Sequence, residues 1–247
     1  MNPSRILIIQ LRRVGDVVFT LPVIGALRRH FPNAQIDFLV EKPADQLVRL
    51  HPDVNEVLVY DKNREFGWIR EVRRRKYDWA LDFLSNGRTL TLSLFSGAKV
   101  RAGFDGHGIR KMVYNHRART TDQKYLVEQK LDLVSSLGVK TDNWSWGLKI
   151  PKEIKDRILQ MAGAVGRKRI GIACVTRRKT REWLLDRVAE LSEKFLSQGY
   201  DVLFLWGPGE KSLVDDLAAK IRTAGKGGKV IVPPETTIIE LAALAEP

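Results

Sequence analysis

The feature that most constrains the fold of this chain is a regular alternation of two patterns. Short runs rich in aliphatic and β-branched residues alternate with amphipathic stretches from the first residues onward. The first run, RILIIQL at residues 5–11, is nearly continuously apolar, as expected of a strand buried on both faces. Such alternation is typical of a parallel sheet covered by helices on both sides, so we predict an α/β protein.

The alternation divides the chain into two parts. Strands are expected at residues 5–11, 35–40, 56–60, 78–83 and 99–104, and again at 169–174, 201–206 and 229–232. Helices are expected at residues 16–30 with a bend or restart at Pro22, and at 64–76, 86–96, 124–137, 183–198, 210–223 and from 236 onward.

The periodic pattern lapses at residues 141–152, where polar, aromatic, Gly and Pro residues replace it. We therefore expect one domain at residues 1–145 and a second at residues 146–247. The second domain has only about three strands, fewer than a doubly wound sheet requires, so we expect it to be incomplete.

Net charge narrows the kinds of partner. The chain has 42 Lys and Arg against 29 Asp and Glu, a net charge of +13, which favours nucleic acid, an anionic membrane leaflet or a phosphorylated substrate. No nucleic-acid-binding motif accompanies the basic residues, so we expect no nucleic acid partner.

The compartment is indicated by what the sequence lacks. No apolar run approaches the roughly 18 uncharged residues that a membrane span needs, and residues 1–10 have no signal-peptide cleavage site. The single cysteine, Cys174, excludes an internal disulfide and a cysteine-clustered metal site. We expect a cytoplasmic protein.

The strongest local signal for function is LRRVGDVV at residues 11–18, between the first strand and the first helix. In an open parallel sheet, ligands bind where strands end, and this loop lies at such an end. Gly15 permits a tight turn or a close approach, and Asp16 would bring a carboxylate to the crevice. Asp16 could alternatively act only as a helix N-cap. A single glycine matches neither a dinucleotide fingerprint nor a P-loop.

Basic residues are concentrated in two segments. In residues 62–76 we expect Lys62, Arg64 and Arg70 to bind an anionic ligand, because the other cations of this segment lie next to the following strand. The alternative is an exposed helix with solvated cations. A second basic segment could extend the same face or contact an anionic leaflet, and consists of Lys99, Arg101, Arg110, Lys111, Arg117 and Arg119.

Residues 5–40, RILIIQLRRVGDVVFTLPVIGALRRHFPNAQIDFLV, resemble the opening of the lipopolysaccharide heptosyltransferases of glycosyltransferase family 9, with its G-D and T-L-P motifs. Residues 169–183 resemble the family's strand, polar loop and K-x-W helix start, with Arg181 in place of the usual lysine. Residues 201–210 resemble its strand and G-x-x-x-E turn. The family's N-D-S-G-P-x-H segment would follow residue 247, so we expect a C-terminally truncated protein that is inactive alone.

The resemblance implies a GT-B arrangement of two Rossmann-like domains, with the acceptor on the first domain and ADP-heptose on the second. It implies inverting transfer of heptose to the lipopolysaccharide inner core, at Kdo-lipid A or a heptosyl acceptor, without metal or cofactor. It assigns the general base to Asp16, acceptor contacts to Arg13, Gly15, Lys62, Arg64 and Arg70, and donor contacts to Thr176 and Arg181.

A peripheral contact with the anionic inner-membrane surface is also expected. Two alternatives stay open: a related family member that uses another nucleotide sugar or acceptor, and a non-catalytic fragment that binds anionic glycolipid.

Overall fold

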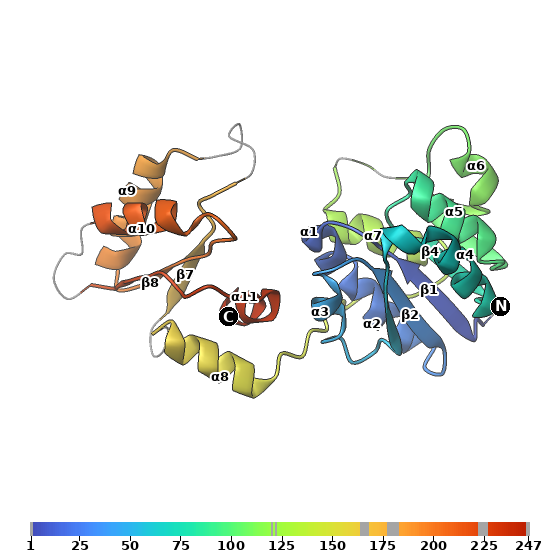
Figure 1. The fold of residues 1–247 in the computed structure, drawn as a ribbon, viewed down its shortest axis with the longest axis horizontal. Coiled ribbons are helices and arrows are strands. Elements are labelled where there is room, and N and C mark those ends of the chain that lie inside the picture. Colours follow the sequence, from blue (N-terminus) through green and yellow to red (C-terminus); the bar gives the residue numbers. More distant parts are fainter. Residues whose placement is uncertain are drawn as a thin grey trace. The chain divides into compact units, whose positions relative to one another are not determined.

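The chain folds into two compact units, Met1–Lys149 and Ile150–Pro247 (Figure 1). The computed structural model describes residues 2–119, 121, 123–163, 168–176, 183–221 and 227–245. The first unit extends past residue 145 because the following segment packs on it. Leu148 lies against its core, and the Lys149 N–H donates to the Leu50 carbonyl at 3.0 Å.

A six-stranded parallel sheet forms the centre of the first unit, in the order β3-β2-β1-β4-β5-β6. The strands are β1 (Arg5–Ile9), β2 (Gln35–Val40), β3 (Glu56–Val59), β4 (Trp79–Asp82), β5 (Val100–Phe104) and β6 (His116–Ala118). Ile8 in β1 pairs in register with Phe38 in β2 and Leu81 in β4. Strand order reverses between β1 and β4, so a crevice is expected at the carboxyl ends of these two strands.

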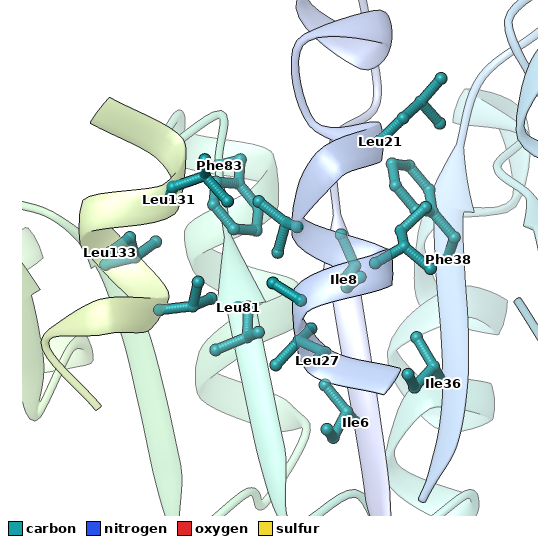
Figure 2. Packing of buried hydrophobic residues seen from close by; sticks show 14 of the residues in the cluster. Ile6, Ile8, Leu21, Leu27, Ile36, Phe38, Leu81, Phe83, Leu131 and Leu133 are labelled. Carbon is teal, nitrogen blue, oxygen red and sulfur yellow. The ribbon is translucent and has the colours of Figure 1, made fainter. Parts of the chain in front are cut away.

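Helices cover both faces of this sheet. They are α1 (Val14–Val18), α2 (Leu21–His30), α3 (Asp45–Val48), α4 (Glu65–Arg74) after the 3-10 turn η1 (Lys62–Arg64), α5 (Gly87–Phe95), α6 (Arg110–Val113) and α7 (Leu126–Ser135). On one face, Ile6 and Ile8 pack against Leu27 of α2 and Leu131 of α7, as Figure 2 shows.

The opposite face of the sheet is formed by the alternate residues of β1. Leu7 and Ile9 pack there with Val72 of α4 and Leu92 of α5. Because successive side chains of a strand point to opposite faces, the apolar run of β1 supplies both cores at once.

The expected restart near Pro22 is confirmed. Two helices replace the single predicted one, and α2 begins at Leu21 with Pro22 in its first turn, where the missing N–H is not needed. The first helix begins earlier than predicted, at Val14 rather than Asp16. The short elements α3, α6 and β6 were not predicted, because three or four residues carry too little periodicity to be recognised.

The second unit contains a parallel sheet in the order β7-β8-β9. Its elements are α8 (Lys152–Met161), β7 (Arg169–Ile172), α9 (Leu185–Ser197), β8 (Asp201–Phe204), α10 (Lys211–Lys220), β9 (Val230–Ile231) and α11 (Ile238–Ala245). Phe204 packs with Val188 of α9 and Val214 of α10, whereas Leu203 packs on the other face with Ile158 of α8 and Leu244 of α11. The predicted α/β class is confirmed in both units. α8 was not predicted because its segment was assigned to the linker.

Candidate active site

The loop between β1 and α1 lies at the carboxyl end of the central strand. Arg13 precedes α1 in the left-handed region, with φ 64°, which is unusual for a residue with a side chain. The tight turn is therefore at Arg13, whereas Gly15 lies within the helix. Gly15 is exposed, and a Cβ built on it would meet no atom within 4 Å, so space is open beside it.

Asp16 is the third residue of α1 and is half-buried. The N-cap position belongs to Arg13, so the alternative that Asp16 is the N-cap of this helix is wrong. Among the described residues, its carboxylate forms no hydrogen bond or ion pair, and only its backbone carbonyl accepts, from the Thr20 hydroxyl at 2.7 Å. A partly desolvated carboxylate without an internal donor is able to accept a proton from a ligand.

Lys130 of α7 lies in the core behind this loop and was not identified from the sequence. It is 6% exposed, and its ammonium donates to Gln10 Oε1 at 3.0 Å and lies 5.4 Å from the centre of the Phe83 ring. Burial lowers the pKa of Lys130 to about 8, against the opposing influence of the Asp16 and Asp82 charges.

A sequence signal for Lys130 did exist. The residue is spaced with Val127, Leu131 and Val134, which lie on the buried face of α7, so a lysine interrupts an apolar helix face. A lysine at such a position is expected to be buried rather than exposed to solvent.

Asp82 ends β4, the strand beside β1, and is fully buried. Its carboxylate accepts from the Tyr114 hydroxyl at 2.6 Å and from the Leu84 and Ser85 amides at 3.0 and 2.9 Å. Burial raises the pKa of Asp82 despite these hydrogen bonds. Its donors come from the chain itself, which indicates a structural role at the switch point.

Lys62 is exposed in η1 and lines a hollow of about 780 Å³ at the carboxyl ends of β2 and β3. The other residues of this hollow are Glu41, Lys42, Asp45, Arg49, Val59, Tyr60 and Asp61. Among the described residues, two buried oxygens here have no hydrogen-bond partner, Asp45 Oδ1 and Tyr60 Oη. The hollow is therefore lined by an exposed lysine that forms no ion pair in the described part of the chain, and by two residues with buried oxygens that lack a partner there.

Arg64 and Arg70 are exposed, but the structure does not bring all three predicted cations into one pocket. Arg64 lines a different pocket of about 310 Å³, beside Trp68 and Arg75. In the described part of the chain, Lys62, Arg64 and Arg70 form no ion pairs. Arg75, in contrast, is paired with Glu56, Glu71 and Asp37, and Arg74 is paired with Glu71.

The predicted donor residues belong to the second unit. Thr176 is half-buried and follows β7, while Arg181 lies outside the described residues. Within the described ranges, no group of three or more His, Cys, Asp or Glu side chains is arranged to hold a metal ion. None of the described helices is both long and apolar enough to cross a bilayer.

The model of glycosyltransferase family 9 (heptosyltransferase) matches residues 66–247. The chain belongs to glycosyltransferase family 9. It is therefore a glycosyltransferase, and the expected family is confirmed by a match over residues 66–247.

Curated relatives of this chain include lipopolysaccharide heptosyltransferases. Lipopolysaccharide heptosyltransferase 3 of Escherichia coli strain K12 is 23% identical over 95% of this chain and 74% of its own length. The lipopolysaccharide core heptosyltransferase OpsX of Haemophilus influenzae is 22% identical over 98% of this chain and 71% of its own length.

Solved structures with the same fold include family 9 enzymes. The glycosyl transferase family 9 protein of Veillonella parvula superposes with a TM-score of 0.79 at 21% identity, over 97% of this chain and 72% of that one. The E. coli heptosyltransferase WaaC with ADP gives a TM-score of 0.73 at 20% identity, over 97% of this chain and 77% of that one. These likenesses establish the GT-B type of fold.

Proposed function

We propose that this family 9 glycosyltransferase moves heptose from ADP-heptose to the anionic inner core of lipopolysaccharide, at Kdo-lipid A or a heptosyl acceptor. The names of the curated relatives and the ADP in the WaaC structure support the donor and the acceptor class. The net charge of +13 suits an acceptor that carries several negative charges.

The proposed reaction is a single displacement. The Asp16 carboxylate accepts the proton of an acceptor hydroxyl as that oxygen attacks the anomeric carbon of the heptose. The bond from the anomeric carbon to the diphosphate oxygen breaks, and ADP leaves with the bonding electrons. Attack from the face opposite the leaving group inverts the anomeric centre. Thr176 and Arg181 would steady the diphosphate through hydrogen bonds and charge.

Acceptor binding is proposed at the carboxyl edge of the first unit. Arg13 and the open space beside Gly15 lie in the same loop as Asp16. Lys62 supplies a cation to the hollow at β2 and β3. Arg64 and Arg70 would add longer-range attraction for phosphates and carboxylates.

The observation that carries the proposal is the half-buried carboxylate of Asp16 at the switch point of the sheet, which has no hydrogen-bond or ion-pair partner among the described residues. We expect Asp16→Asn to reduce turnover of ADP-heptose with Kdo-lipid A by about a hundredfold or more, the usual scale for loss of a general base. The exposed carboxylate of Asp142 offers a matched control, and Asp142→Asn should keep full activity.

Both variants should melt as the wild type does, since neither carboxylate forms a hydrogen bond within the described residues. Wild-type turnover by the Asp16→Asn protein would disprove the base assignment. Turnover measured across ADP-, UDP- and GDP-linked sugars would separate ADP-heptose from another nucleotide sugar, and a preference for a different donor would replace the proposed substrate.

We also propose that the protein is cytoplasmic and makes peripheral contact with the anionic surface of the inner membrane. In the α6 region, Ile109 and Met112 are 61% and 82% exposed and lie on either side of Arg110 and Lys111 in the sequence. Apolar side chains next to cations suit the interface of an anionic leaflet.

A further inference from the structure

The buried ammonium of Lys130 has an unusual environment. Among the described residues, no carboxylate oxygen lies within ion-pair distance of its Nζ, although the residue is 6% exposed. A buried cation without a close counter-ion is unfavourable unless hydrogen bonds and nearby charges compensate for the lost water. The groups that compensate therefore indicate what Lys130 does.

Hydrogen bonds connect Lys130 to the loop that carries Asp16. Its ammonium donates to Gln10 Oε1 at 3.0 Å, and Gln10 Nε2 donates to the Arg12 carbonyl at 3.0 Å. Arg12 is followed by the left-handed turn at Arg13 and then by α1. The side chain of Gln10 thus connects the start of α1 to α7, through a hydrogen bond between residues 120 positions apart.

Two carboxylates act on Lys130 through their charge, Asp16 from α1 and Asp82 from β4, while Gln10, which follows β1, is its neutral partner. Asp82 already accepts three hydrogen bonds, from Tyr114 and two backbone amides. Asp16 accepts none from the described residues.

We infer that Lys130 is a positioning residue for Asp16, which fixes the β1–α1 loop through Gln10 and holds a buried positive charge near the Asp16 carboxylate. The inference rests on the proposed role of Asp16 as the base. A buried positive charge favours the charged form of a nearby carboxylate, which is the form that accepts a proton. At neutral pH Lys130 itself carries the charge, since its pKa is about 8.

The first test uses the pH dependence of kcat/KM. Lys130→Met keeps the length of the side chain and removes its charge. In this variant the acidic limb of the kcat/KM profile should move up by about one pH unit. Lys130→Arg should keep the limb near its wild-type position. Lys124 precedes the same helix, is exposed and pairs with Asp132, so Lys124→Met is the matched control and should leave the limb unchanged. A folded Lys130→Met protein with the wild-type acidic limb would overturn the inference.

The second test needs no activity and decides the matter even if Lys130→Met does not fold. Titration of the Lys130 ¹³Cε resonance should give a midpoint near 8 in the wild type. The midpoint should fall in Asp16→Asn, because a charge that raises the pKa of Lys130 is removed, and should stay in Asp142→Asn.

These readouts separate the two proposals. An unchanged Lys130 midpoint in an inactive Asp16→Asn protein overturns the inference and leaves the base assignment standing. A shifted midpoint in a fully active Asp16→Asn protein supports the contact between the two residues and removes the base assignment.

Discussion

At the scale of single residues, Arg75 joins three acidic side chains at the edge of the first sheet. It lies 3.3 Å from the fully buried Asp37, 2.6 Å from Glu56 and 2.8 Å from Glu71. Replacing it with glutamine leaves the buried Asp37 carboxylate without its cation, so we expect Arg75→Gln to lower the free energy of unfolding by on the order of 3 kcal/mol in denaturant titrations.

The same substitution should change the response to acid. Hydrogen bonds to Arg75 hold the pKa of Glu56 below its ordinary value of 4.5, and those to Arg74 and Arg75 do the same for Glu71. Their contribution is present above pH 4.5 and is lost as the pH falls through the lowered values, so the acid-induced loss of stability should be smaller in Arg75→Gln. Arg187→Gln, which breaks an exposed pair with Glu190, is the control. Identical unfolding midpoints and pH profiles for the two variants would contradict the role of Arg75.

At the scale of an element, the η1–α4 segment divides its cations into two groups. Arg74 and Arg75 are neutralised by acidic neighbours, whereas Lys62, Arg64 and Arg70 are unpaired among the described residues. Replacing these three with alanine should raise the KM for an anionic acceptor by roughly tenfold, about 0.5 kcal/mol for each exposed charge, and weaken its salt dependence.

The donor KM should stay unchanged in this triple variant, since the acceptor is the ligand that carries the additional charges. Arg74→Ala on the same helix is the matched control, because Glu71 already neutralises Arg74. Equal acceptor KM values for the triple variant and the wild type at low salt would show that the three cations are merely solvated.

At the scale of the whole molecule, the net charge of +13 should attract the protein to anionic surfaces. We expect co-sedimentation with vesicles that contain phosphatidylglycerol at low salt, release at high salt, and little binding to neutral phosphatidylcholine vesicles. Ile109→Ser with Met112→Ser should reduce the binding that survives moderate salt, because both side chains are exposed. Binding that depends on neither lipid charge nor salt concentration would contradict a peripheral electrostatic contact.

Much of the fold could be predicted from local patterns. The apolar run of β1 and the helical spacing of Val188, Leu191 and Phe195 in α9 predict elements that the structure confirms. The elements missed in the first unit, such as α3 and β6, are stabilised by their neighbours rather than by their own sequence periodicity. The position of the Asp16 loop after the first strand was predicted correctly, but the strained turn at Arg13 was not, because no local rule places an arginine there.

The sequence by itself determined the α/β class, the order of most elements and the family, because these depend on periodicity and on motifs that are contiguous in the chain. Only the tertiary structure brought Lys130 to the loop of Asp16 through Gln10. It also paired Arg75 with three acids, while Arg64 forms no ion pair with any described residue. Charge compensation depends on which side chains come into contact in the folded protein. A single sequence does not show that two residues 120 positions apart are in contact.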